Sequence, residues 1–276
     1  MNKRQLIFFV IALLISLLSC NNYLPGYDFA LFKNTSAKDL ARAVELNDTG
    51  WINEILDKDP KLVNYQEKKF GNTLLMLSVV NNKTLSTEAL LKHGADPFIV
   101  DNYHNNTMYL SCGYLNTSKC DTKKIDLLIK YGGSFKKEDA LKKCKQGKYP
   151  KYNYVTESIT VCFNVFKKVI NYGGDINEYY KRFHERPVYY ALLYEKFETA
   201  KYLIIEKKAE IPKVFSIGYY NEKPNQKVNV FEFIEKTNFN STDYNPKLLK
   251  ELVEYLTNHP EQFVSAPDSL VKLRLE

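Results

Sequence analysis

The stretch "GNTLLMLSVVNNKTLSTEALLKHGADPFIVDN", residues 71–102, decides the fold of this chain. An apolar run over 74–80 is followed by a polar turn at 81–83, and a second segment of helical pattern covers 86–92. Gly94 then supplies the left-handed residue that commonly ends a helix. The pattern predicts two short helices joined by a turn and followed by an extended finger.

This stretch resembles an ankyrin repeat, whose usual unit pairs a T-P-L-H-x-A helix with a second helix ending in L-L-x-x-G-A-D. Residues Thr73 to Ser78 stand at the first motif, with its Pro, His and Ala replaced. Residues Leu90 to Asp96 match the second motif completely. The resemblance implies an all-α, ankyrin-repeat solenoid of stacked helix pairs with short β-hairpin or loop fingers. Stacking is required because each pair is too small to bury its own apolar face.

Two further stretches repeat the pattern more loosely. Residues 106–133 carry it with a longer turn between the helices. Residues 186–210 carry it with Lys208 in place of the helix-ending glycine, which weakens the predicted helix stop. With these stretches, the ankyrin-repeat domain is expected to span residues 35–258 in about six units, some of them degenerate.

The remaining units are less regular. We predict helices at 138–145 and 157–171 for a divergent unit that ends near Gly174. Residues 259–276 are expected to form a C-terminal tail. Terminal helix pairs are expected at Ala37–Leu46 with Trp51–Leu56 and at Val228–Lys236 with Pro246–Asn258.

The first 19 residues have the pattern of a secretory signal. Lys3 and Arg4 precede an apolar run over 6–18, which is shorter than the roughly 20 residues that a membrane-spanning helix needs. A basic start, a short apolar run and small Ser19 near the end are typical of a signal peptide. We expect residues 1–19 to be removed.

Leu17-Leu18-Ser19-Cys20 resembles the lipobox of bacterial lipoproteins. The resemblance implies cleavage before Cys20, acylation of its thiol and new amino terminus, and residues 20–34 as a lipidated tether. Several acyl chains anchor stably where a single chain binds only marginally. An uncleaved signal anchor and an ordinary signal peptide with an incidental cysteine are the alternatives.

Four cysteines remain, and an exported chain permits disulfides between them. The repeat alignment places Cys112 and Cys144 on neighbouring first helices. Such helices pack about 8–10 Å apart, beyond the roughly 7 Å Cα separation that a disulfide allows. We therefore predict pairing within units, Cys112 with Cys120 and Cys144 with Cys162. Four partly buried free thiols are the alternative.

Composition and motifs argue against catalysis and nucleic-acid binding. The formal net charge of +7 is spread along the chain without a dense basic stripe. Asp96 and Asp175 follow helix-ending glycines, where an aspartate bonds turn backbone. No zinc-ligand spacing or nucleophile motif is present. We expect no enzyme activity, metal, cofactor or small-molecule substrate. The histidines are widely separated: His93, His104, His184 and His259.

The predicted fingers mix aromatic and charged groups, the composition expected of protein-binding hot spots. They cover residues 65–70, 101–106 and 179–186. The alternative for Phe70 and Phe183 is that they pack under the next unit. The predicted partner-contact residues are Tyr103, His104, Arg182, Phe183 and Arg186.

Two functions agree with these expectations. The lipobox resemblance, without an acidic residue after Cys20, implies an envelope lipoprotein of the outer membrane that faces the periplasm. Envelope ankyrin proteins resemble immunity proteins, which implies an inhibitor that caps a secreted antibacterial toxin. The alternative is a periplasmic scaffold or adaptor for an endogenous envelope protein, and a third option is an accessory subunit of an enzyme.

Overall fold

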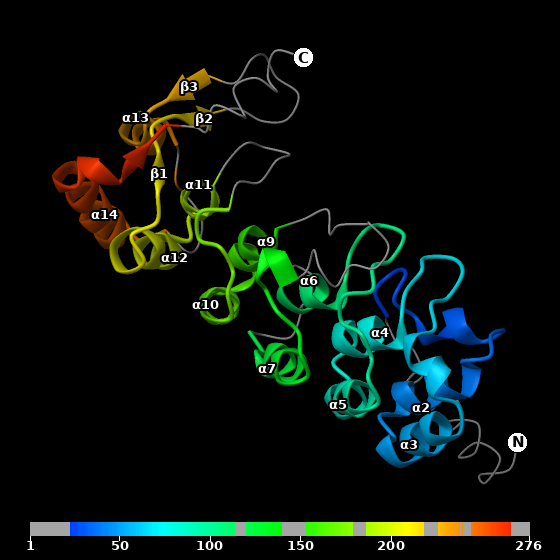
Figure 1. Cartoon of the computed structure of the whole chain (residues 1–276). Helices are drawn as coiled ribbons and strands as arrows, with labels where there is room; N and C mark the ends of the chain where they lie inside the picture. Colours follow the sequence, from blue (N-terminus) through cyan, green and yellow to red (C-terminus); the bar gives the residue numbers. More distant parts are fainter. Residues whose placement is uncertain are drawn as a thin grey trace, which may run out of the picture.

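The computed structural model describes residues 23–113, 120–139, 153–178, 186–217, 226–237, 239 and 244–265. Helices arranged in pairs run along the molecule in two rows (Figure 1). The inner row is α2 (Lys38–Leu46), α4 (Leu74–Val80), α6 (Thr107–Cys112), α9 (Tyr154–Val161) and α11 (Pro187–Leu193). The outer row is α3 (Thr49–Lys58), α5 (Thr84–Lys92), α7 (Lys123–Lys130), α10 (Phe163–Asn171) and α12 (Phe197–Lys201).

Short elements complete the two ends of the array. The last helix pair is α13 (Val230–Lys236) and α14 (Pro246–Asn258). Single turns occur at η1 (Phe29–Phe32), η2 (Pro60–Asn64), η3 (Tyr202–Glu206) and η4 (Pro260–Gln262). Strand β1 (Ile211–Pro212) pairs in parallel with β4 (Phe263–Val264), and β2 (Phe215–Ile217) pairs antiparallel with β3 (Gln226–Val228).

Neighbouring units share one apolar core. Along the inner row α2 contacts α4, α4 contacts α6, α6 contacts α9 and α9 contacts α11. Leu56, Leu90 and Leu128 come from the outer helices of three successive units, and each is at most 1% exposed. Because each unit completes the core of the next, the predicted solenoid of stacked helix pairs is confirmed. Within the described residues, no helix is long and apolar enough to cross a bilayer.

Polar caps start the inner helices. The Thr73 hydroxyl accepts a hydrogen bond from the Met76 amide, and the Asn106 side chain accepts one from the Tyr109 amide. The Asn153 side chain accepts from the Val155 and Thr156 amides. Such caps satisfy backbone donors that have no partner inside the helix.

A left-handed residue ends each outer helix of the middle units. Gly94, Gly132 and Gly173 have φ angles of 84°, 91° and 99°. Lys208 adopts the same left-handed conformation, with φ of 54°, so the helical segment before it ends without a glycine. The Lys208 ammonium lies 4.7 Å from the centre of the Tyr255 ring, a cation–π contact that favours this position.

The divergent unit differs from its prediction. The segment 157–171 is not one helix, because the chain breaks at Cys162, whose φ of −169° and ψ of 162° are extended. Helices α9 and α10 on either side of Cys162 are therefore the two helices of this unit, and α9 lies beside α6. The other predicted helix, 138–145, lies mostly outside the described residues.

Both predicted terminal segments are partly integrated into the fold. Residues 27–32, predicted as part of a tether, pack in the core, where Tyr27, Phe29 and Phe32 are buried. The tether prediction is therefore wrong for these residues, because their aromatic side chains cover the first two units. At the other end, β4 pairs with β1 and joins the start of the predicted tail to the domain.

A buried lysine makes the stability of this fold depend on pH. The Lys124 side chain is 1% exposed, and its ammonium donates to the Val79 carbonyl at 2.8 Å. Burial lowers the pKa of Lys124 from 10.5 to about 8. Below pH 8 the amine is charged in both the folded and the unfolded chain, so the full cost of burying that charge is present. Between pH 8 and 10.5 only the folded chain loses the proton, so stability rises with pH.

We expect Lys124→Met to abolish this pH-dependent component. The difference in free energy of unfolding between variant and wild type should favour the variant at pH 7, by at most about 3 kcal/mol, and shrink toward pH 10.5. Urea unfolding of both proteins across this range measures it. A difference that is constant with pH would contradict the buried, charged lysine.

Candidate protein-binding surface

Two adjacent fingers form a rigid edge at the start of the array. The first is closed by a bridge between Gln66 and Thr73, and the second by a bridge between Val100 and Asn106. The Gln66 side-chain amide donates to the Val100 backbone carbonyl at 2.9 Å. The Asn102 backbone amide donates to the Phe70 carbonyl at 2.8 Å. The two fingers are therefore hydrogen-bonded to each other along their length.

Buried carboxylates shape both finger turns. The Glu67 side chain accepts from the Lys69 and Phe70 amides, each at 2.7 Å, and it is 2% exposed. In the next finger the Asp101 side chain accepts from the Tyr103 and Asn105 amides, each at 2.8 Å. Burial raises the pKa of the Asp101 carboxyl, against the lowering effect of its hydrogen bonds. Sequence reasoning did not single out these two acids, because a charged finger residue is normally taken as exposed.

The fingers present one aromatic and cationic tip. Tyr103 is 61% exposed and stacks on Phe70, with ring centroids 6.3 Å apart. The Lys69 ammonium lies 4.9 Å from the centre of the Phe70 ring. We name Lys69, Phe70 and Tyr103 the finger patch. Because the carboxylates fix the backbone beneath it, this backbone loses little freedom when a partner binds.

The other predicted contact residues have different positions. His104 follows Tyr103 in the left-handed conformation, with φ of 66°, and is half-buried. Arg182 and Phe183 lie outside the described residues. Arg186 is buried, which corrects its prediction as a contact residue. Its guanidinium donates to the Asn177 carbonyl at 2.8 Å and pairs with Glu210 at 2.7 Å.

We expect Arg186→Gln to act on stability and not on partner binding. The substitution removes a charge-assisted pair and leaves the Asn177 carbonyl poorly satisfied, so the free energy of unfolding should fall by about 2 kcal/mol. Chemical denaturation measures this loss. The conservative Arg186→Lys variant should recover only part of it, since it cannot reproduce two directed hydrogen bonds.

The N-terminal segment, residues 23–32, covers part of the inner face. The Asn72 side chain donates to the Gly26 carbonyl at 2.7 Å, and the Asn81 side chain donates to the Tyr27 carbonyl at 2.8 Å. Asn72 and Asn81 flank α4 at its two ends. The N-terminal segment of the chain therefore occupies part of the inner surface of the first two units.

The disulfide also differs from its prediction. Cys120 pairs with Cys162, with Cα atoms 5.9 Å apart, and Cys112 is a buried free thiol. The predicted pairs Cys112–Cys120 and Cys144–Cys162 are thus wrong in the partners of Cys120 and Cys162, and Cys144 lies outside the described residues. Cys120 and Cys162 both lie in connectors between inner and outer helices, so the bond joins neighbouring units.

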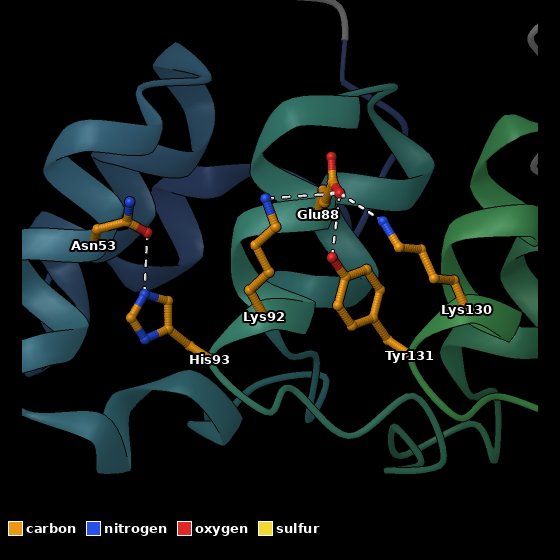
Figure 2. Close-up of polar contacts among 6 residues, drawn as sticks. All are labelled: Asn53, Glu88, Lys92, His93, Lys130 and Tyr131. Atoms are coloured by element: carbon orange, nitrogen blue, oxygen red, sulfur yellow. Dashed lines mark hydrogen bonds and ion pairs between the residues drawn. The ribbon is translucent and has the colours of Figure 1, made fainter.

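The outer helices are linked by polar contacts of a repeated kind (Figure 2). The residue before each helix-ending glycine reaches back to the preceding unit. His93 is hydrogen-bonded to Asn53 at 3.0 Å, and the Tyr131 hydroxyl donates to Glu88 at 3.2 Å. The Tyr172 hydroxyl donates to Asp126 at 3.0 Å. These contacts account for His93 structurally and do not form a site.

Further polar groups have structural roles. Hydrogen bonds from Lys130 and Tyr131 lower the pKa of the half-buried Glu88. The Asp96 carboxylate accepts a hydrogen bond from the Phe98 backbone amide, and the Asp175 carboxylate accepts one from the Asn177 backbone amide. These bonds confirm the predicted structural role of both aspartates. Among the residues that the structure describes, no group of three histidine, cysteine or acidic side chains could hold a metal ion.

Comparison with known proteins identifies the repeated unit. The family model described as "Ankyrin repeat" matches residues 70–102, which hold the helices α4 and α5. The match covers 33 of the 276 residues of the chain. The matched segment begins in one finger and ends in the next, so of the finger patch it includes Phe70 but not Lys69 or Tyr103. No curated protein matches the chain in sequence.

Solved ankyrin structures have low similarity to the chain. The human ASB11 ankyrin repeat domain is 15% identical, with a TM-score of 0.47, over 61% of this chain and 68% of that one. EF0377, an ankyrin repeat protein, is 19% identical, with a TM-score of 0.35, over 62% of this chain and 99% of that one. The family match over residues 70–102 is to a unit that typically mediates protein–protein interactions.

Proposed function

We propose that this chain is a lipid-anchored envelope protein that binds and inhibits a secreted antibacterial toxin. The observation that carries the binding function is the finger patch, where an exposed tyrosine, a stacked phenylalanine and a lysine stand on a rigid edge. Tyrosine is one of the residues in which binding hot spots are enriched. The lipobox-like sequence at Cys20 supports the location, on the periplasmic face of the outer membrane.

Inhibition follows by occlusion. The finger edge projects from the helices, so it can enter a concave active site, and Tyr103 can fill a pocket there while the adjacent unit excludes substrate. An anchored inhibitor also stays where the toxin arrives, which raises its effective concentration at the membrane. The alternative, a scaffold for an endogenous envelope protein, uses the same surface with a resident partner.

A pull-down separates these two functions. The full protein would be recovered from envelope extracts of cells that carry their own secretion machinery, and its partners identified by mass spectrometry. We expect a secreted hydrolase in near equal amount, with its activity lost in the complex. Recovery of a resident envelope protein without any toxin would contradict inhibition and support the scaffold.

We expect Tyr103→Ala to weaken the recovered complex by about 30-fold, the effect of losing a hot-spot residue worth about 2 kcal/mol. Titration calorimetry with the purified partner measures the change. Tyr244→Ala is the matched control, since Tyr244 is 41% exposed but lies outside the fingers. Equal affinities for the two variants would show that the finger patch is not the contact surface.

A further inference from the structure

Two exposed leucines lie at the end of the first two units opposite to the fingers. Leu46 ends α2 and is 53% exposed, and Leu85 is in the first turn of α5 and is 56% exposed. Of the large apolar and aromatic side chains that the structure describes, only Tyr103 is more exposed. The connectors that carry the leucines are joined, because the Ser86 amide donates to the Asn47 side chain at 2.8 Å and the Ser86 hydroxyl to the Val44 carbonyl at 2.9 Å.

The chain enters the fold beside these leucines. The Tyr23 hydroxyl donates to Glu45 at 2.8 Å, and Glu45 is the residue before Leu46. Cys20 precedes Tyr23 by three residues, so its Cα lies within about 11 Å of the Tyr23 Cα even with the chain fully extended. An acylated Cys20 would therefore hold the membrane surface next to this end of α2.

We propose that the connector edge, residues 46–49 and 81–85, rests on the lipid bilayer, with Leu46 and Leu85 inserted at the level of the headgroups. This orientation rests on the lipid anchor proposed above. Apolar side chains of surface-bound helices enter about 5–10 Å into the boundary between headgroups and acyl chains. The nearby charges are mixed, with Arg42 and Lys83 against Glu45 and Asp48, so the tether and the apolar area provide the attraction.

The orientation has a consequence for the finger patch. The N-cap residue of α4, Thr73, lies beside the fingers, and its C-cap residue, Asn81, lies in the connector edge. Fingers and connectors thus lie at opposite ends of the same helix. With the connector edge on the bilayer, the finger patch points away from the membrane, toward partners that arrive from the aqueous side.

Quenching by brominated lipids tests this orientation. The chain has a single tryptophan, Trp51, so Trp51→Phe gives a silent background. Into this background we would introduce Leu46→Trp, Leu85→Trp or, as the control, Tyr103→Trp. The full acylated proteins would be reconstituted in phosphatidylethanolamine and phosphatidylglycerol vesicles with or without bromine on the acyl chains. We expect tryptophan at 46 and 85 to lose about half of its emission, and tryptophan at 103 to lose none.

Two further readouts distinguish failure of the lipid anchor from failure of the proposed orientation. The mass of the N-terminal peptide reports acylation of Cys20, and vesicle flotation reports attachment. Acylated protein that floats with the vesicles, but whose tryptophans at 46 and 85 are no more quenched than at 103, would overturn the orientation alone. An N-terminus without acyl chains would overturn the anchor, and the orientation with it.

Discussion

Replacing Leu90 by alanine will lower the free energy of unfolding by about 3 kcal/mol or more. Leu90 belongs to the ankyrin segment 70–102 and is fully buried in the core that the units share. Truncation removes apolar contacts and leaves a cavity that close-packed neighbours cannot fill, a loss of about 2–5 kcal/mol in other proteins. Urea unfolding followed by circular dichroism measures the change.

Leu85→Ala is the matched control for this experiment. It makes the same substitution on the same helix, α5, at a side chain that is 56% exposed. We expect a change within about 0.5 kcal/mol, as for most surface substitutions. Similar losses at the two positions would contradict the placement of α5, with Leu90 inward and Leu85 outward.

Loss of the Cys120–Cys162 disulfide will destabilise the oxidised protein by about 4 kcal/mol. The bond joins residues that are 42 positions apart, and closing a loop of this length removes that much conformational free energy from the unfolded chain. The double variant Cys120→Ser, Cys162→Ser should show the loss. Thermal unfolding with and without reductant measures it, and reductant should bring the wild type to the level of the double variant.

Cys112→Ala serves as the control for thiol effects. Cys112 is a buried thiol that forms no disulfide. Burial raises the pKa of this thiol well above the usual range, so it takes part poorly in thiol–disulfide exchange. Its variant should keep the full sensitivity to reductant. Peptide mapping that found Cys112 bonded to Cys120 would restore the pairing expected from the sequence and contradict the structure.

The helix pairs could be predicted from the sequence where local signals agree. Around α4 and α5 the apolar spacing, the Thr73 cap and Gly94 all indicate the same boundaries, and the predicted bounds of α4 agree with the structure. The break at Cys162 has no such signal, because apolar residues continue through 154–171 without glycine or proline. Only the spacing from Asn153 to Gly173, close to that from Thr73 to Gly94, indicates a complete unit there.

The candidate site residues and the disulfide were harder to predict, because their positions depend on contacts between residues far apart in the sequence. Arg186 looked exposed because arginine is rarely buried, and the Glu210 and Asn177 groups that satisfy it come from neighbouring loops. The predicted disulfide pairing rested on an alignment of first helices. The break at Cys162 invalidates that alignment, because it makes α9 the first helix of the divergent unit. The exposure of Tyr103 could be predicted, because it lies among polar residues at a finger tip, where the Phe70 ring stacks against it. Its contact with a partner stays a prediction.

The disulfide also changes how the molecule responds to a stretching force. When the chain is pulled from its two ends, the residues between Cys120 and Cys162 are bypassed by the bond and bear no load. The oxidised chain is therefore shorter by about 140 Å of contour length than the reduced chain at full extension. Force applied at the C-terminus reaches the N-terminal units through the disulfide sulfurs and not through the backbone of that loop.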